Sequence, residues 1–376
     1  MESLDIVDLV PELSDLELAI FLSLVAREHC LIETKKDAID DVAKELALIC
    51  LNTFNLSCVI LDCSSETSLD NFGNGMLVSD ARRVDHHGSS IGTRGVPDLS
   101  SDYPSFRSIQ ESREYSRSGM KGNYLDDKRV ANVVIAKNFN RTDEHVQIHV
   151  LEQILRSKRI FTKTAVHSTP KAFLFIPVVA SNDNDLRPLS LNKHLNDHIF
   201  ISHVHDPQDG YPNLEEDDKW LSDDRASISS VIRKSDTKSQ KRLAMRHKID
   251  EEAITKFQQL SDNVTVCAEV TRYLQDIVVF LRLNRAVAGG VSAKATFHLF
   301  RLSKCLAPLH GIDYLTPSIV ALAAKKVYRH RIIVASAEND RSLQYGSNPI
   351  VVSRLLMGVS PETIIDDIIG EVEAPL

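Results

Sequence analysis

The chain has 376 residues, of which 43% are hydrophobic and 26% are charged, and its formal net charge is −8. This length allows two folded units joined by linkers, and the apolar fraction is sufficient for a core in each. The negative charge disfavours a general nucleic-acid binder or a protein held on an anionic membrane, because both partners repel an acidic surface.

The first residues of the sequence show no basic stretch followed by an apolar one, so no secretory signal is visible. No apolar run approaches the ~18 residues that a membrane-spanning helix needs. The sequence therefore predicts a soluble, cytoplasmic protein.

Two helices and a strand are predicted before residue 78. Ser14 and Glu17 have the spacing of a capping box, and the apolar stretch behind them predicts a helix from residue 16 to about residue 30. A short apolar run at residues 58–61 predicts the first strand of a core sheet. Between them, a second helix is predicted from one apolar stripe, which consists of Ile39, Val42, Leu46 and Ile49.

Residues 79–128 differ from their surroundings in composition. They are rich in Ser, Arg, Gly and Asp and contain no apolar period. Such a segment cannot bury enough apolar surface to offset the entropy of ordering, so we predict a disordered insertion.

Three further strands are predicted from nearly continuous apolar runs that begin near Val130, Phe173 and His198. Helix-length segments separate them. Continuous rather than alternating apolar runs indicate burial on both faces, as in a parallel sheet. The predicted fold class is therefore α/β, with a parallel sheet and helices on both of its faces.

The last third of the chain is predicted to be helical. The apolar residues between Val266 and Leu281 share one stripe, and Ser292 can cap the helix that follows. Thr316 then places a cap before Pro317 at the first helical position. These signals predict a small all-helical domain behind the sheet.

The sequence thus divides into six predicted parts. These are the N-terminal helices and first core strand (1–78), the insertion (79–128), the rest of the core (129–220), a linker (221–249), the helical lid (250–335) and a C-terminal tail (336–376).

Two stretches of the chain resemble a known family. One is helical and contains Gly290-Val-Ser-Ala-Lys294 and Tyr328-Arg-His-Arg331; the other spans residues 130–216 and ends in Gly210-Tyr-Pro-Asn-Leu-Glu-Glu216. Both are similar to the AAA+ ATPases of the MoxR and magnesium-chelatase I-subunit group. The resemblance implies an AAA+-like core followed by an AAA lid.

The residues with which that family handles ATP are mostly replaced. A phosphate loop reads GxxxxGK[ST], whereas residues 62–69, behind the predicted first core strand, contain no glycine and no lysine. Lys137 and Asn138 occupy the positions of the acids that hold Mg²⁺. Residues 196–198, where the resemblance places the arginine finger, contain no arginine.

Two further positions are partly kept. Asn182 matches the polar sensor residue of the family, and Lys294 stands where the lid carries a sensor arginine. Lysine keeps the charge but lacks the planar fork of arginine. Asn182 and Lys294 are therefore predicted to be the remnants of a nucleotide pocket.

A histidine-rich segment offers a different kind of site. His194, His198, His203 and His205 lie close together in the sequence, with Asp206 beside them. Imidazole and carboxylate groups at such spacing can bind Zn²⁺ or Ni²⁺. A histidine-based metal-binding protein is therefore one alternative function.

The favoured function is that of a degenerate AAA+ protein that does not hydrolyse ATP and serves as an interaction or scaffold subunit. We expect no cofactor, no metal, and no nucleic-acid or membrane partner. A protein partner or an AAA+ subunit is expected, and a homo-oligomer is compatible with this function. The other alternative is a magnesium-chelatase-type ATPase subunit, which would use ATP and Mg²⁺.

Overall fold

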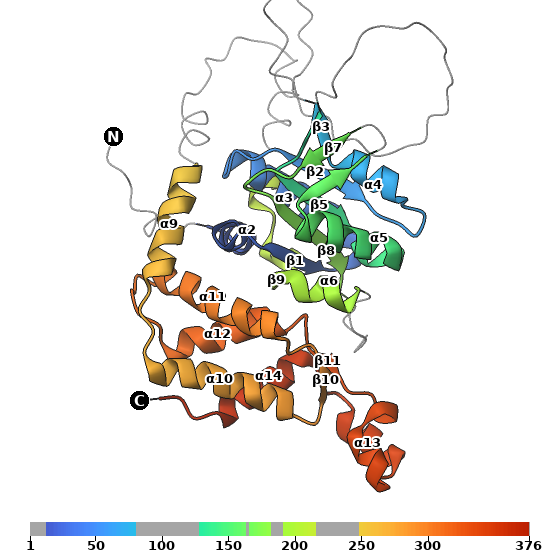
Figure 1. The fold of residues 1–376 in the computed structure, drawn as a ribbon, viewed down its shortest axis with the longest axis vertical. Helices are drawn as coiled ribbons and strands as arrows, with labels where there is room; N and C mark the ends of the chain where they lie inside the picture. The colour runs from blue at the N-terminus through green and yellow to red at the C-terminus, as the bar shows by residue number, and fades with distance from the viewer. Residues whose placement is uncertain (1–12, 80–127, 163–164, 182–190, 216–247, 376) are drawn as a thin grey trace, which may run out of the picture.

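The computed structural model describes residues 13–79, 128–162, 165–181, 191–215 and 248–375. A five-stranded sheet with the order β2-β5-β8-β1-β9 forms its centre (Figure 1). All four neighbouring pairs are parallel, which confirms the predicted fold class. The strands are β1 (His29–Thr34), β2 (Cys58–Asp62), β5 (Val133–Lys137), β8 (Leu174–Ala180) and β9 (Ile199–His205).

Strand β1 was not predicted: it begins within the end of the first predicted helix and continues through residues 31–34, for which no element was expected. Helix α2 (Asp15–Ala26) ends because Arg27 adopts a left-handed backbone with φ 50°, and its N–H group bonds back into the last turn. Strand β1 then runs buried through its whole length. The prediction that residues 58–61 form the first core strand is therefore wrong, because β2 is the second strand and lies at an edge of the sheet.

Helices cover both faces of the sheet, as predicted. Val133 and Ile135 of β5 point to the face covered by α2 and α3 (Ile39–Asn52). Their neighbour Val134 points to the opposite face. That face is covered by α4 (Leu69–Gly75), α5 (Glu144–His149) and a π-helix that continues α5 (Val150–Arg156).

Short antiparallel pairs and one short helix complete the core. Strands β3 (Leu77–Ser79) and β4 (Lys128–Val130) pair with each other, so the two ends of the predicted insertion lie side by side. Strands β6 (Arg159–Phe161) and β7 (Val166–Ser168) form a second pair, and α6 (Lys193–His198) leads into β9. Residues 80–127, and most of the predicted linker, lie outside the described residues.

The C-terminal part is helical, and its caps are those expected. Ser292 and Thr316 accept hydrogen bonds from the first turns of α11 and α12. The predicted tail also folds, because α14 packs against α10 and α12. The elements are α9 (Glu251–Asn263), α10 (Ala268–Leu283), β10 (Val287–Gly289), α11 (Ala293–Leu309), α12 (Pro317–Tyr328), β11 (Ile333–Val334), α13 (Pro349–Leu356) and α14 (Pro361–Glu371).

The lid and the sheet share one hydrophobic core. A single cluster of buried side chains extends from α2 and α3 through α9 to α12. Phe21 of α2 and Phe257 of α9 pack edge to face with ring centroids 4.9 Å apart. The lid is therefore packed onto the sheet domain (Figure 1). Among the described residues, no helix combines the length and apolarity that crossing a membrane requires.

Candidate functional site at the carboxyl edge of the sheet and the lid junction

In an open parallel sheet, ligands bind beyond the carboxyl ends of the strands, where successive connections leave in opposite directions. Strand β1 lies at this place in the sheet. Its two neighbours are β8 and β9, whereas β2, the next strand of this sheet in the sequence, lies at the far edge. A phosphate loop would therefore follow β1, and not the segment 62–69. There the chain makes only one short 3₁₀ turn (Lys36–Ala38) before α3 begins. The turn contains no glycine, and the whole sequence contains no Gly-Lys pair.

Carboxylates occupy the start of α3, where a bound phosphate would lie. Asp40 and Asp41 are in the first turn of this helix, and Asp37 is in the turn before it. A helix N-terminus attracts negative charge, whether from phosphate or from side chains. The side chains of this chain already supply negative charge at the start of this helix.

Lys137 lies between one of these carboxylates, Asp40, and Asp62 at the end of β2. Its Nζ lies 2.6 Å from Oδ1 of Asp40 and 3.4 Å from Oδ2 of Asp62, and its side chain is only 16% exposed. Burial lowers the pKa of Lys137, but the hydrogen bond and charge of Asp40 and the charge of Asp62 outweigh it and raise that pKa. A cation held by two carboxylates thus lies where the resemblance places a metal-binding acid. Asp40 was not anticipated from the sequence.

Asn138 has a backbone role. Its φ of 53° is left-handed, a region that asparagine tolerates better than other non-glycine residues. Its N–H donates to the carbonyl of Val178 in β8 over 2.8 Å. The amide at this position is therefore explained by the sharp turn that ends β5.

These contacts predict that acids cannot simply be restored at residues 137 and 138. Lys137→Asp would gather three carboxylates, and Asn138→Glu would put an unfavourable residue in the left-handed region. We expect the double variant to lose ~3 kcal/mol of unfolding free energy. The control pair Lys137→Met and Asn138→Gly should lose only ~1 kcal/mol, because Asp40 and Asp62 are well exposed without the lysine. Urea denaturation measures both, and equal losses would contradict this interpretation.

The structure places only one of the two predicted pocket remnants. Asn182 lies outside the described residues. Lys294 contacts His198, which precedes β9, so it lies at the amino edge of the sheet and away from Lys137. The role of Lys294 in a nucleotide pocket remains a prediction that this geometry does not support.

Arg331 is the centre of the junction between sheet and lid. Its side chain is 1% exposed. The guanidinium donates to the carbonyls of Ile199 and Phe200 in β9 and of Val327 in α12. Burial is the main reason why the pKa of Arg331 falls to about 10. In the sequence, Arg331 was identified only as the end of a stretch that resembles the lid of the family.

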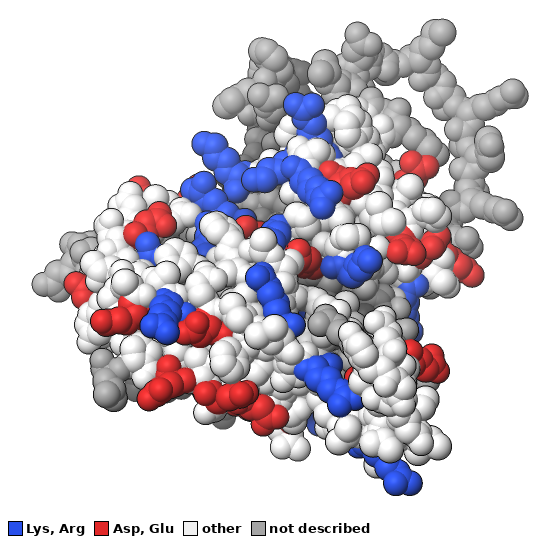
Figure 2. All heavy atoms as spheres, turned by 60° about the horizontal axis from the view of Figure 1, so that its bottom comes forward, with Lys and Arg blue, Asp and Glu red and all other residues white. Residues whose placement is uncertain are grey.

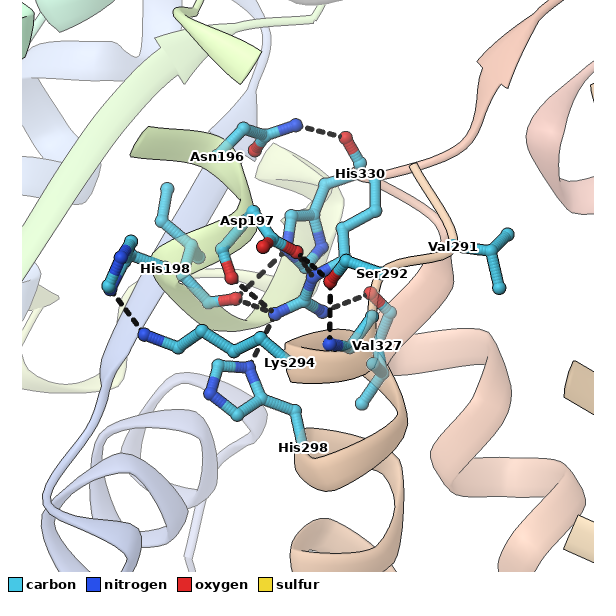
Figure 3. A network of polar contacts seen from close by, with 12 residues as sticks. Asn196, Asp197, His198, Val291, Ser292, Lys294, His298, Val327 and His330 are labelled. Atoms are coloured by element: carbon cyan, nitrogen blue, oxygen red, sulfur yellow. Dashed lines mark hydrogen bonds and ion pairs between the residues drawn. The ribbon is translucent and has the colours of Figure 1, made fainter. Parts of the chain in front are cut away.

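The segment expected to hold an arginine finger faces the lid of the same chain. Asp197 accepts a 2.6 Å hydrogen bond from the hydroxyl of Ser292, and Asn196 donates to the carbonyl of His330. Figure 3 shows Asp197 beside Ser292 and Asn196 beside His330. Residues 196–198 thus contribute to the junction between sheet and lid.

The four histidines of the alternative metal site have different surroundings. His198 contacts Lys294, His203 lies 3.5 Å from Lys326, and the ring of His205 packs on Tyr211. His194 is exposed. In the described part of the chain, no group of three or more His, Cys, Asp or Glu side chains could hold a metal ion.

Comparison with known proteins agrees with this architecture. Residues 280–349 match the family model of the AAA lid domain. The fold is similar to the crystal structure of a candidate ATPase from Cytophaga hutchinsonii, with a TM-score of 0.55. That likeness covers 99% of this chain and 94% of the other at 14% identity, so it shows the fold alone. The chain therefore has an AAA+-like α/β fold with a helical lid.

Several yeast proteins named "Maintenance of telomere capping protein 2" are similar in sequence to part of the chain. The protein from Candida glabrata is 29% identical over 143 residues, which is 36% of this chain and 34% of that protein. The protein from Saccharomyces cerevisiae is 34% identical over 100 residues, which is 25% of this chain and 28% of that protein. The matched region thus spans about a third of these relatives.

Proposed function

We propose that the protein is an AAA+-like module that does not hydrolyse ATP and acts as an interaction or scaffold subunit. The observation that carries this proposal is the ion-paired Lys137 at the carboxyl edge. Lys137 is ion-paired with Asp40 and Asp62 at the edge of the sheet where such folds bind ligands, which supports the proposal. The short turn after β1 offers no glycine N–H groups in their place.

An exposed apolar surface in the C-terminal tail supports an interaction role. Around α13, Tyr345, Ile350, Leu355 and Met357 each expose 60% or more of their surface. Gathered apolar side chains on the outside of a protein are typical of surfaces that contact other proteins. The names of the yeast relatives suggest an assembly that serves telomere capping as the setting for this role. A cytoplasmic location and the MoxR and magnesium-chelatase subgroup are part of the same proposal.

Isothermal titration with Mg·ATP tests the nucleotide part of this proposal. We expect no saturable heat from the carboxyl edge, because phosphate would meet Asp37 and Asp40 without a phosphate loop. The Lys137→Ala variant should give the same result as the wild type. A saturable heat that disappears in Lys137→Ala would place the nucleotide at this edge and favour the magnesium-chelatase-type ATPase instead.

A further inference from the structure

The amino edge of the sheet, opposite the edge discussed above, holds a cavity of about 190 Å³ between the core and the lid. Its charge is unusual for an acidic protein. The described residues that line it include five cationic side chains and one carboxylate, namely Arg27, Arg156, Lys158, Lys171 and Lys294 against Glu28. Figure 2 shows one face of the molecule, on which basic and acidic side chains lie close to one another in several places.

The single lining carboxylate is already engaged. Oε1 of Glu28 lies 3.5 Å from Nη1 of Arg301, which is outside the lining, and 3.8 Å from Nε2 of His298. The charge of Lys294 also acts on Glu28, so one carboxylate is shared between Arg301 and the cations of the lining. The cavity keeps an excess of positive charge.

His198 lies between two of the lining cations. Its Nδ1 contacts Nζ of Lys294, and Nε of Arg156 points at its Nε2 over 3.3 Å. Burial, followed by the charges of Lys294 and Arg156, lowers the pKa of His198 to about 4, so the ring is neutral at pH 7. A neutral imidazole has only one acceptor nitrogen. Only one of the two cations can therefore donate to the ring, and the other faces an N–H group.

The backbone around the cavity is also uncommon. Arg156 ends the π-helix, a conformation that is rare and concentrates at functional sites. Lys158 and Arg27 both have a left-handed backbone, with φ values of 55° and 50°. Such helix ends usually carry glycine, and here two cations take that place beside one cavity.

We propose that this cavity binds a phosphate dianion, either free or as the end group of a small phosphate ester, through Arg156, Lys294 and His198. A phosphate has enough acceptor oxygens to take bonds from both cations and from the imidazole N–H at once. A ligand with one carboxylate would balance the charge of only one of the five lining cations.

The other wall of the cavity favours the ester. Ile154, Leu155, Pro170 and Phe173 line it beside the cations. Apolar walls with a few placed polar groups are typical of sites for small organic ligands. The expected ligand therefore has a phosphate at one end and an apolar or ring-shaped part at the other.

Titration at low ionic strength with inorganic phosphate, phenyl phosphate and phenol tests the proposal. We expect both phosphates to bind and phenol not to bind. Tighter binding of phenyl phosphate would identify the ester as the ligand type, and equal binding would identify free phosphate. Arg156→Gln and Lys294→Gln should each weaken binding at least ~tenfold, because each removes a charge-assisted hydrogen bond. Arg354→Gln, an equal loss of charge on exposed α13, should leave binding unchanged.

A further variant separates binding from folding. Lys158→Gly removes a lining charge and relaxes the left-handed backbone, so its melting temperature should equal or exceed that of the wild type while phosphate binding weakens. The His198 ring signals in NMR should also shift as phosphate is added. Absence of binding to the wild type, or binding that these variants leave unaltered, would overturn the proposal. Variants separate this cavity from the carboxyl edge: a heat of Mg·ATP binding that is lost in Arg156→Gln and kept in Lys137→Ala would come from this cavity and would leave the proposed function intact.

Discussion

Arg331→Met is expected to lower the free energy of unfolding by ~3–5 kcal/mol, because it removes one partner from a buried charged network. Methionine has a similar length but donates no hydrogen bond. The carbonyls of Ile199 and Phe200 would lose a donor inside the lid junction, and Asp197 would lose the cation 3.7 Å from its carboxylate. Since these groups join β9 to the lid, the lid should also become the first part to open.

Urea denaturation and limited proteolysis measure these two effects. The matched control is Arg272→Met on α10, whose side chain is 84% exposed, and it should cost less than ~0.5 kcal/mol. A loss for Arg331→Met of under ~1 kcal/mol would show that the shared apolar core alone holds the lid in place.

The protein is expected to lose stability steeply as the pH falls from 6.5 toward 4.5. Burial lowers the pKa of His29 to about 3 and that of His298 to about 2, and it lowers the pKa of His330 well below its ordinary value. In the unfolded chain these histidines titrate near ~6.5. The unfolded state therefore binds protons first, and each histidine removes up to ~1.4 kcal/mol per pH unit below that value.

The direction of this pH effect on stability follows from which state, folded or unfolded, binds protons more readily. The stabilising contribution of these neutral rings is complete above the unfolded pKa and is lost as the pH falls toward the folded pKa. Glu28 and Glu33 act in the opposite direction, because burial raises their pKa values. These three histidines alone outnumber the two glutamates in this window.

A single variant isolates one of these contributions. The Nδ1 of His298 contacts the guanidinium of Arg331, so His298→Gln keeps an acceptor there but cannot titrate. We expect its stability between pH 6.5 and 4.5 to fall less steeply, by ~1 kcal/mol per pH unit. His194→Gln, on the exposed surface of α6, should leave the slope unchanged. Equal slopes for wild type and His298→Gln would contradict the assignment.

The lid was predictable because local signals mark its ends. Ser292 and Thr316 are caps that act within a few residues of themselves, and the apolar stripe of α10 has a clear helical period. Strand β1 was not predictable in the same way. A fully buried strand lacks alternation, and no glycine or proline separates α2 from β1.

The site chemistry was predicted only in part. Lys137 and Asn138 could be identified by resemblance, but the pairing of Lys137 with Asp40 joins residues 97 positions apart. The amino-edge cavity gathers side chains from five separate segments between Arg27 and Lys294. Contacts between residues so far apart in the sequence depend on the order of strands in the sheet. That order could not be predicted without β1.

The release of phosphate from Mg·ATP tests the central claim most directly. It should be measured for the wild type, for Lys137→Ala, and for Arg156→Gln, which removes a cation from the amino-edge cavity. At the carboxyl edge of the sheet, Lys137 is ion-paired with Asp40 and Asp62, so we expect all three proteins to show the background rate. Turnover by the wild type that persists in Arg156→Gln and is abolished in Lys137→Ala would show a working catalytic site built around Lys137 and would contradict the proposed function.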